Sequence, residues 1–206
     1  MGSLRLSFHL VAILVILFGA LAGMLYVPGD AQVHLAVAEQ FWLGQPFRYN
    51  GVDGEMVVAS TSPFWTLMIW AFFTMAGYAA PLLLKMIVLS IWLCVGFLIY
   101  RTARVLWDLP QSSSFAACML WFGSCSVTIN SLGGLENVLC ALQLLLLCWI
   151  SGPYAERPPG WWRALILGAI GGWCVLTRLD GGMLAVLVIG IFFLHALISS
   201  ARRNQA

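Results

Sequence analysis

Charged side chains are scarce in this sequence of 206 residues. Only 9% of the residues are Asp, Glu, Lys or Arg, whereas about a quarter are charged in an ordinary soluble domain. In contrast, 62% of the residues are apolar and the mean hydropathy is +0.94. This composition excludes a soluble globular fold. The ten basic and eight acidic residues give a formal net charge of +2, too small for a nucleic-acid-binding surface, so we expect no nucleic acid as a partner.

Cysteine motifs and internal repeats are also absent. The six cysteines lie in apolar runs, without a C-x-x-C pair or a histidine at metal-ligand spacing, and this pattern indicates small buried apolar side chains rather than disulfides or a metal site. The sequence has no low-complexity tract and no inverted repeat of the kind that transporters show. We expect residues 1–206 to form a single transmembrane domain. The cysteines are Cys94, Cys118, Cys125, Cys140, Cys148 and Cys174.

Seven apolar runs follow one another along the chain and predict an all-α fold, a polytopic membrane bundle of helices. The run at 63–77 has only 15 residues, so we expect it to lie in the membrane interface or to re-enter without crossing. Six spans remain, and an external loop of about residues 28–81 separates the first span from the second. The runs are 6–27, 63–77, 82–100, 112–130, 135–150, 161–177 and 182–199.

The distribution of charge agrees with six spans. Seven of the ten basic residues then lie on the cytoplasmic side with the N-terminus, and only Arg48, Lys85 and Arg178 lie on the other side, as the positive-inside rule requires. Six of the eight acidic residues lie on the extracytoplasmic side. Acidic residues have little influence on the orientation in which a chain inserts into the membrane, so their excess on this side indicates a function at the extracytoplasmic face. We therefore expect a multi-pass protein of the plasma (inner) membrane with its active face outside.

The first external loop contains two signals for helices. Asp30 follows a turn and is a good N-cap for a helix that ends at Gly44. This helix is rich in apolar residues and includes Trp42, so we expect it to lie along the lipid headgroups. Ser62 and Pro63 predict the N-cap and the first position of a second helix.

The acidic residues on this face each have an ordinary structural explanation. Asp30 could simply cap its helix, with His34 as an incidental neighbour four residues later. Glu136 suits the dipole at the start of a span. Arg178 and Asp180 could neutralise each other.

Together, however, these residues form a pattern. Three loops that are far apart in the sequence bring acids to one side of the membrane, accompanied by Lys85 and Arg178. Lys85 alone could only extend its ammonium group to the headgroups. As a pair, the two cations are suited to hold a phosphate. The pattern suits a site where a membrane-borne phosphate leaves and a carboxylate acts as a base.

Short elements along nearly the whole chain resemble the GT-C superfamily of integral-membrane glycosyltransferases, which includes enzymes that transfer arabinofuranosyl or mannosyl units from polyprenyl-phosphate donors. In this sequence Gly29 stands where the family has the first acid of a pair, Leu179 stands where it has a proline, and the several further spans of the family are absent. The elements are Gly29-Asp30-Ala31, Gly44-Gln45-Pro46-Phe47, Thr61-Ser62-Pro63-Phe64-Trp65, Gly133-Gly134-Leu135-Glu136 and Thr177-Arg178-Leu179-Asp180-Gly181.

The resemblance implies an inverting cell-envelope transferase with Asp30 as the general base. A polyprenyl-phosphate sugar would be the donor, and a hydroxyl of a glycan, lipid or protein the acceptor. Arg178 and Lys85 would stabilise the departing phosphate. Glu136 and Asp180 would bind sugar hydroxyls or, with a divalent metal ion, bridge the phosphate, and His34 would support the base.

Two other functions remain open at this point. The chain could be a non-catalytic membrane protein that binds a lipid-linked sugar, or a subunit of a larger assembly in which a partner subunit supplies further spans. A transporter is disfavoured because no charged residue lies in the middle of a span and no predicted helix is broken at its centre.

Overall fold

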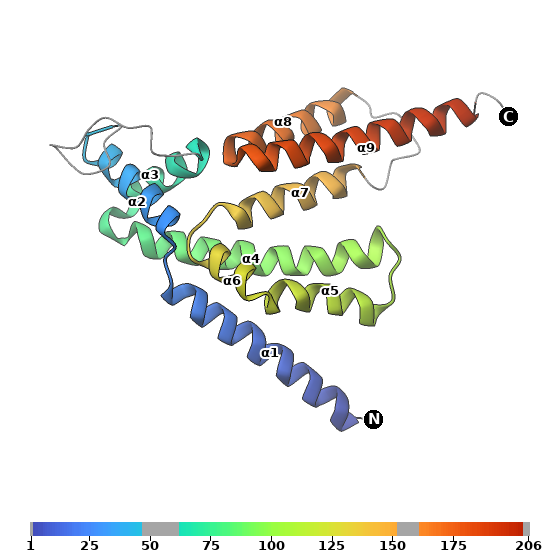
Figure 1. Ribbon diagram of the computed structural model, residues 1–206, viewed down its shortest axis with the longest axis horizontal. Helices are drawn as coiled ribbons and strands as arrows, with labels where there is room; N and C mark the ends of the chain where they lie inside the picture. The colour runs from blue at the N-terminus through green and yellow to red at the C-terminus, as the bar shows by residue number, and fades with distance from the viewer. Residues whose placement is uncertain (1, 47–61, 152–160, 204–206) are drawn as a thin grey trace.

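The computed structural model describes residues 2–46, 62–151 and 161–203. Helices are the only regular elements in these ranges, so the predicted all-α fold is confirmed. In Figure 1, α4, α5, α7, α8 and α9 lie alongside one another, α1 diverges from them, and α2 and α3 gather at one end. The helices are α1 (Gly2–Leu25), α2 (Gly29–Trp42), α3 (Pro63–Ala76), the 3-10 helix η1 (Gly77–Ala79), α4 (Ala80–Val105), α5 (Gln111–Gly123), α6 (Cys125–Leu132), α7 (Asn137–Ser151), α8 (Trp161–Thr177) and α9 (Leu179–Arg203).

Membrane-length helices are fewer than the sequence predicts. Among the described residues, one helical stretch is long and apolar enough to cross a membrane, Pro63–Val105 with 43 residues. Two bent pairs, α1 with α2 (53°) and α5 with α6 (59°), raise the number to three if each pair counts as one span. Three shorter apolar helices lie in α7, α8 and α9. The arrangement with six spans therefore stays a prediction.

The run at 112–130 is not one helix, contrary to the expectation of unbroken spans. It breaks at Ser124, where the backbone is extended (φ −73°, ψ 105°), and α5 and α6 meet there at 59°. The Ser124 hydroxyl accepts a hydrogen bond from the backbone N–H of Val127 at 3.5 Å and so caps α6. A serine that bonds to the local backbone competes with helix continuation, which explains a break inside an apolar run.

The ends of α2 and α3 agree in part with the prediction. The helix α2 begins at Gly29 with Pro28 at the N-cap position, so the prediction that Asp30 is the N-cap is wrong, and Asp30 lies in the first turn. The stop at Gly44 is confirmed: α2 ends at Trp42, and Gly44 has a φ of 77°, a conformation that favours glycine. The N-cap position of Ser62 and the first position of Pro63 are confirmed for α3. Phe47 and Thr61 lie outside the described residues.

Large side chains pack at the end of the bundle where α2 and α3 gather. Trp65 of α3 and Trp92 of α4 are fully buried, together with Leu132 of α6 and Val138 of α7. Close contacts between side chains of this size stabilise helix packing through many small van der Waals attractions. This core fixes α3, α4, α6 and α7 relative to one another and thereby supports the loops that join them.

The cysteines agree only in part with the expected burial. Cys140 and Cys174 are buried, Cys118 and Cys148 are half-buried, and Cys94 and Cys125 are exposed. All six are free thiols in the structure.

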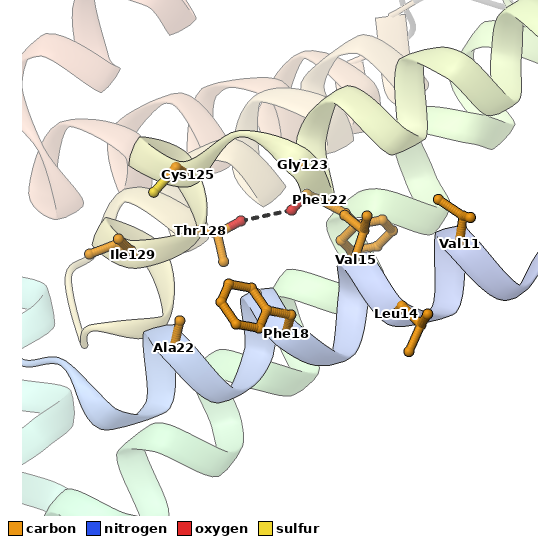
Figure 2. A pocket seen from close by; sticks show the side chains of 11 residues that line it. Val11, Leu14, Val15, Phe18, Ala22, Phe122, Gly123, Cys125, Thr128 and Ile129 are labelled. Atoms are coloured by element: carbon orange, nitrogen blue, oxygen red, sulfur yellow. Dashed lines mark hydrogen bonds between the residues drawn. The ribbon is translucent and has the colours of Figure 1, made fainter.

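An apolar groove of about 410 Å³ separates α1 from the break between α5 and α6 (Figure 2). Phe18 and Val15 line it from α1, and Phe122 and Thr128 line it from the opposite side. The Thr128 hydroxyl donates to the carbonyl oxygen of Phe122 at 3.1 Å, so this polar group has a partner within the wall. The groove is therefore an apolar surface along α1.

Candidate functional site

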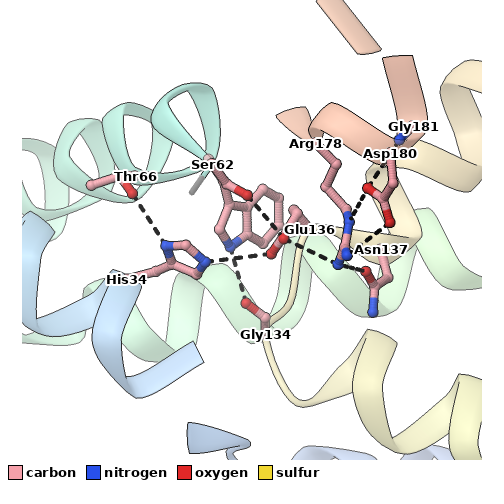
Figure 3. A network of polar contacts seen from close by, with 10 residues as sticks. His34, Ser62, Thr66, Gly134, Glu136, Asn137, Arg178, Asp180 and Gly181 are labelled. Carbon is pink, nitrogen blue, oxygen red and sulfur yellow. Dashed lines mark hydrogen bonds and ion pairs between the residues drawn. The ribbon is translucent and has the colours of Figure 1, made fainter. Parts of the chain in front are cut away.

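Polar side chains from four separate parts of the chain meet around Glu136 (Figure 3). His34 comes from α2, Ser62 from the N-cap of α3, and Arg178 from the junction of α8 and α9. Glu136 itself immediately precedes α7, and its side chain is only 5% exposed. Residues that lie as many as 144 positions apart in the sequence thus form one polar cluster at one end of the bundle.

Two glycines allow the loop before α7 to approach α2 and α3. Gly134 has a φ of 103°, which a residue with a side chain rarely adopts. A Cβ atom on Gly133 would lie 2.3 Å from Cδ of Pro28, so only glycine permits this contact with the start of α2. The indole N–H of Trp65 donates to the carbonyl oxygen of Gly134 at 3.0 Å. These contacts place Glu136 directly below α2 and α3.

The two carboxylate oxygens of Glu136 have different neighbours. The Ser62 hydroxyl donates to Oε1 at 2.9 Å, and Nη1 of Arg178 lies 3.3 Å from the same oxygen. Nε2 of His34 lies 3.6 Å from Oε2. Ser62 therefore occupies the N-cap position of α3 while its side chain stabilises the buried carboxylate, and it makes no side-chain hydrogen bond to the helix backbone. A buried carboxylate needs partners of this kind.

His34 connects Glu136 to α3. Its Nδ1 lies 3.3 Å from the Thr66 hydroxyl, and its Nε2 faces Glu136. Burial lowers the pKa of His34, although the nearby charges of Glu136 and Asp30 act to raise it. The network fits a neutral ring whose Nε2–H faces the carboxylate and whose Nδ1 accepts the hydroxyl proton of Thr66.

Arg178 joins both carboxylates of the cluster. Its Nε and Nη2 donate to the two oxygens of Asp180 at 2.8 and 3.0 Å, and its Nη1 donates to Oδ1 of Asn137 at 2.5 Å and to Glu136. The hydrogen bond to Asp180 raises the pKa of Arg178 above its usual value. Arg178 and Asp180 therefore form the ion pair expected of two residues that neutralise each other, and the same guanidinium also contacts Glu136.

Asp30 lies at the edge of the cluster. Its side chain is exposed in the first turn of α2, four residues before His34. Its charge acts on His34 together with the charges of Glu136 and Arg178, so all three are close to that ring. Asp30 is therefore accessible to a substrate hydroxyl, whereas Glu136 is buried.

Lys85 contacts a different part of the chain. Its Nζ donates to the carbonyl oxygens of Gly23, Met24 and Tyr26 at 3.2, 3.0 and 2.6 Å. These carbonyls lie in the last turn of α1 and just after it, where a helix leaves carbonyl groups without intrahelical partners, and a lysine is well suited to bind there. The carbonyl of Gly23 also accepts the backbone N–H of Tyr26 at 3.4 Å. Lys85 thus ties α4 to the joint between α1 and α2. Its role at a phosphate stays a prediction.

Four further residues of the cluster were not among the predicted site residues. Ser62 and Trp65 belong to the element that carries the resemblance, but the sequence predicted only a helix cap for Ser62. Asn137 follows Glu136 directly, and Thr66 lies one turn after Ser62. A polar residue at helical spacing from Ser62 in an otherwise apolar helix is the signal that could have identified Thr66.

The sequence left open a divalent metal ion that Glu136 and Asp180 would hold at the phosphate. The described ranges contain no group of three or more His, Cys, Asp or Glu side chains arranged to hold a metal. Glu136 and Asp180 contact two sides of one guanidinium, whose single positive charge offsets one of their two negative charges. We therefore derive no step through a metal.

Comparison of the chain with protein-family models, with curated proteins and with solved structures finds no match. The cluster must therefore be interpreted from its own geometry. It contains an accessible carboxylate, an imidazole, and a guanidinium held by two acids. These groups can accept a proton, bind hydroxyls and bind an anion.

Proposed function

We propose that the chain is a GT-C-type glycosyltransferase, or its N-terminal module, that transfers a sugar from a polyprenyl phosphate to an acceptor hydroxyl. The observation that carries this proposal is the convergence of Ser62, Glu136 and Arg178, each from one of the elements that resemble the family, with His34 of α2 beside them. Three short motifs that had arisen by chance would have no reason to meet at one place. Their meeting supports a common function.

In this proposal, Asp30 is the general base. Its exposed carboxylate takes the proton of the acceptor hydroxyl, the acceptor oxygen attacks the anomeric carbon, and the bond from that carbon to the phosphate oxygen breaks with inversion. The electron pair leaves with the polyprenyl phosphate. Arg178 stabilises the negative charge that grows on this phosphate, and such stabilisation is effective at a site held in place beforehand.

The membrane arrangement of this proposal has six spans and places the cluster on the extracytoplasmic side. Exposed Arg101 and Arg104 lie at the far end of α4 from the cluster, as the positive-inside rule predicts for the cytoplasmic end. An even number of spans puts the C-terminus in the cytoplasm with the N-terminus. A fluorescent-protein fusion at residue 206 should then fluoresce and a periplasmic-phosphatase fusion should be inactive. The opposite pattern would contradict six spans.

A transfer assay tests the chemistry. The purified chain is reconstituted in lipid with radiolabelled polyprenyl-phosphate sugars and a membrane extract that supplies acceptors and partner proteins. We expect Asp30→Asn to abolish transfer while membrane insertion stays normal. The matched control is Asp108→Asn, the same change in the exposed segment between α4 and α5, and it should transfer normally. Normal turnover by Asp30→Asn would exclude Asp30 as the base.

A second candidate is a non-catalytic protein that binds a lipid-linked sugar, alone or as a subunit of a larger assembly. The observation that favours it is that Arg178 already pairs with Glu136 and Asp180, so its guanidinium is occupied without a substrate. Donor binding without transfer under every condition, with wild type and Asp30→Asn alike, would favour this candidate.

A further inference from the structure

The guanidinium of Arg178 has two sides with different partners (Figure 3). On the inner side, Nη1 donates to Asn137 at 2.5 Å and to Glu136 at 3.3 Å. On the outer side, Nε and Nη2 donate to Oδ1 and Oδ2 of Asp180 at 2.8 and 3.0 Å. The outer pair is a bidentate contact, in which two parallel N–H groups meet two oxygens.

The two sides also differ in burial. The Glu136 side chain is 5% exposed and the Asp180 side chain is 66% exposed, with Arg178 between them at 33%. An exposed ion pair is worth little, because water competes for both partners. A buried carboxylate with its own hydrogen bond from Ser62 is far harder to move. The inner contacts therefore orient Arg178, and the outer contact can be exchanged.

A phosphate group fits the outer side as well as a carboxylate does. Both present two oxygens at a spacing that matches the Nε and Nη2 protons of arginine. A phosphate that replaced Asp180 would leave the inner contacts intact, so the guanidinium would need no reorientation. Asp180 would keep its hydrogen bond from the Gly181 backbone N–H at 2.9 Å and would gain water.

We propose that Asp180 is a placeholder: it holds the outer side of Arg178 until the phosphate of the lipid donor displaces it. This inference rests on the proposed function and deepens it. It gives Asp180 the opposite role to a substrate-binding residue, because Asp180 competes with the phosphate. Its consequence is selectivity, since a weakly charged anion cannot displace the carboxylate whereas a phosphate can.

The direction in which one substitution changes the Kd for phosphate tests this role. Asp180→Asn removes the charge but keeps the shape and the oxygen that accepts from Gly181. Binding of radiolabelled decaprenyl phosphate is measured with the full chain in phosphatidylcholine nanodiscs, with circular dichroism to confirm folding. We expect the Kd to fall by about two- to fivefold in Asp180→Asn, the range that corresponds to release of an exposed ion pair. Arg178→Gln should raise the Kd by about tenfold or more, and Asp108→Asn should leave it unchanged.

The outcomes separate the placeholder from the proposed function. Weaker or equal binding by Asp180→Asn, with wild-type binding intact, would overturn the placeholder and leave the transferase proposal standing. Inorganic phosphate serves as a second probe, followed by phosphorus NMR. Tighter binding of inorganic phosphate by Asp180→Asn without any binding of decaprenyl phosphate would support the placeholder for a free anion and contradict the lipid donor. Binding of neither probe to wild type would overturn both.

Discussion

Glu136→Gln is expected to destabilise the protein by about 1.5–3 kcal/mol. The substitution keeps the size of the side chain and removes its charge. A hydrogen bond to a charged group is roughly twice as strong as a neutral one, so the bond from Ser62 at 2.9 Å loses about 1 kcal/mol. The contact with Arg178 at 3.3 Å adds at most about 1 kcal/mol, because Arg178 is one-third exposed. The new amide group also turns N–H protons towards His34, which leaves a buried donor without a partner, at a cost of about 1 kcal/mol.

Thermal unfolding in detergent, followed by circular dichroism, measures this loss. For a chain of this length, 1.5–3 kcal/mol corresponds to a fall in Tm of roughly 3–12 °C. The matched control is Glu39→Gln on α2, a half-buried glutamate outside the cluster, which should change Tm by less than about 2 °C. In the double variant Glu136→Gln/Arg178→Gln, the second change should cost less than it does alone. A Tm of Glu136→Gln equal to that of the control would refute the view that the buried charge is held by its partners.

Three further predictions follow from the contacts described. Burial lowers the pKa of His34, so the unfolded chain binds more protons than the folded chain in the pH range just below the usual value of 6.5. The free energy of unfolding should therefore fall on acidification through this range, and a pH series on His34→Gln should show a smaller fall. Ser62→Ala should lower the free energy of unfolding by about 1.5 kcal/mol, and Ser62→Asp by about 3 kcal/mol or more, because aspartate places a second carboxylate beside Glu136. If Ser62→Asp is as stable as wild type in chemical denaturation, Ser62 acts only as a cap. Gly96→Ala should lower the free energy of unfolding by about 1–3 kcal/mol, because its Cβ would lie 2.1 Å from Cζ of Phe122. Gly168→Ala has open space around it and should be neutral or stabilising by up to about 1 kcal/mol, so equal melting temperatures for the two variants would contradict the packing.

Hydropathy predicted some helices well and others poorly. The run at 161–177 coincides with α8, because its ends are set by residues that interrupt a uniform apolar segment. The run at 112–130 gave no sign of the break at Ser124, since one serine in an apolar run is compatible with a continuous helix. The joint between α1 and α2 depends on Lys85, whose partners lie about 60 residues away in the sequence. Local patterns carry no information on such contacts.

The charged members of the cluster and His34 were predictable, whereas its other polar members and its arrangement were not. The sequence brought His34, Glu136, Arg178 and Asp180 to one side of the membrane, and the structure brings their side chains together. Which carboxylate is buried could not be inferred, because the burial of Glu136 depends on the approach of Gly133 to Pro28 and on the packing of Trp65. Distances between loops are set by this packing rather than by spacing along the chain.

The position of Arg178 late in the sequence has a consequence for biosynthesis. A chain is made from its N-terminus, so α2, α3 and α7 are synthesised before the junction of α8 and α9 exists. During this interval Glu136 has Ser62 and His34 nearby but no cation. The buried carboxylate gains its ion pair with Arg178 only when the last two helices dock. The order of synthesis therefore makes completion of the polar cluster a late step of assembly.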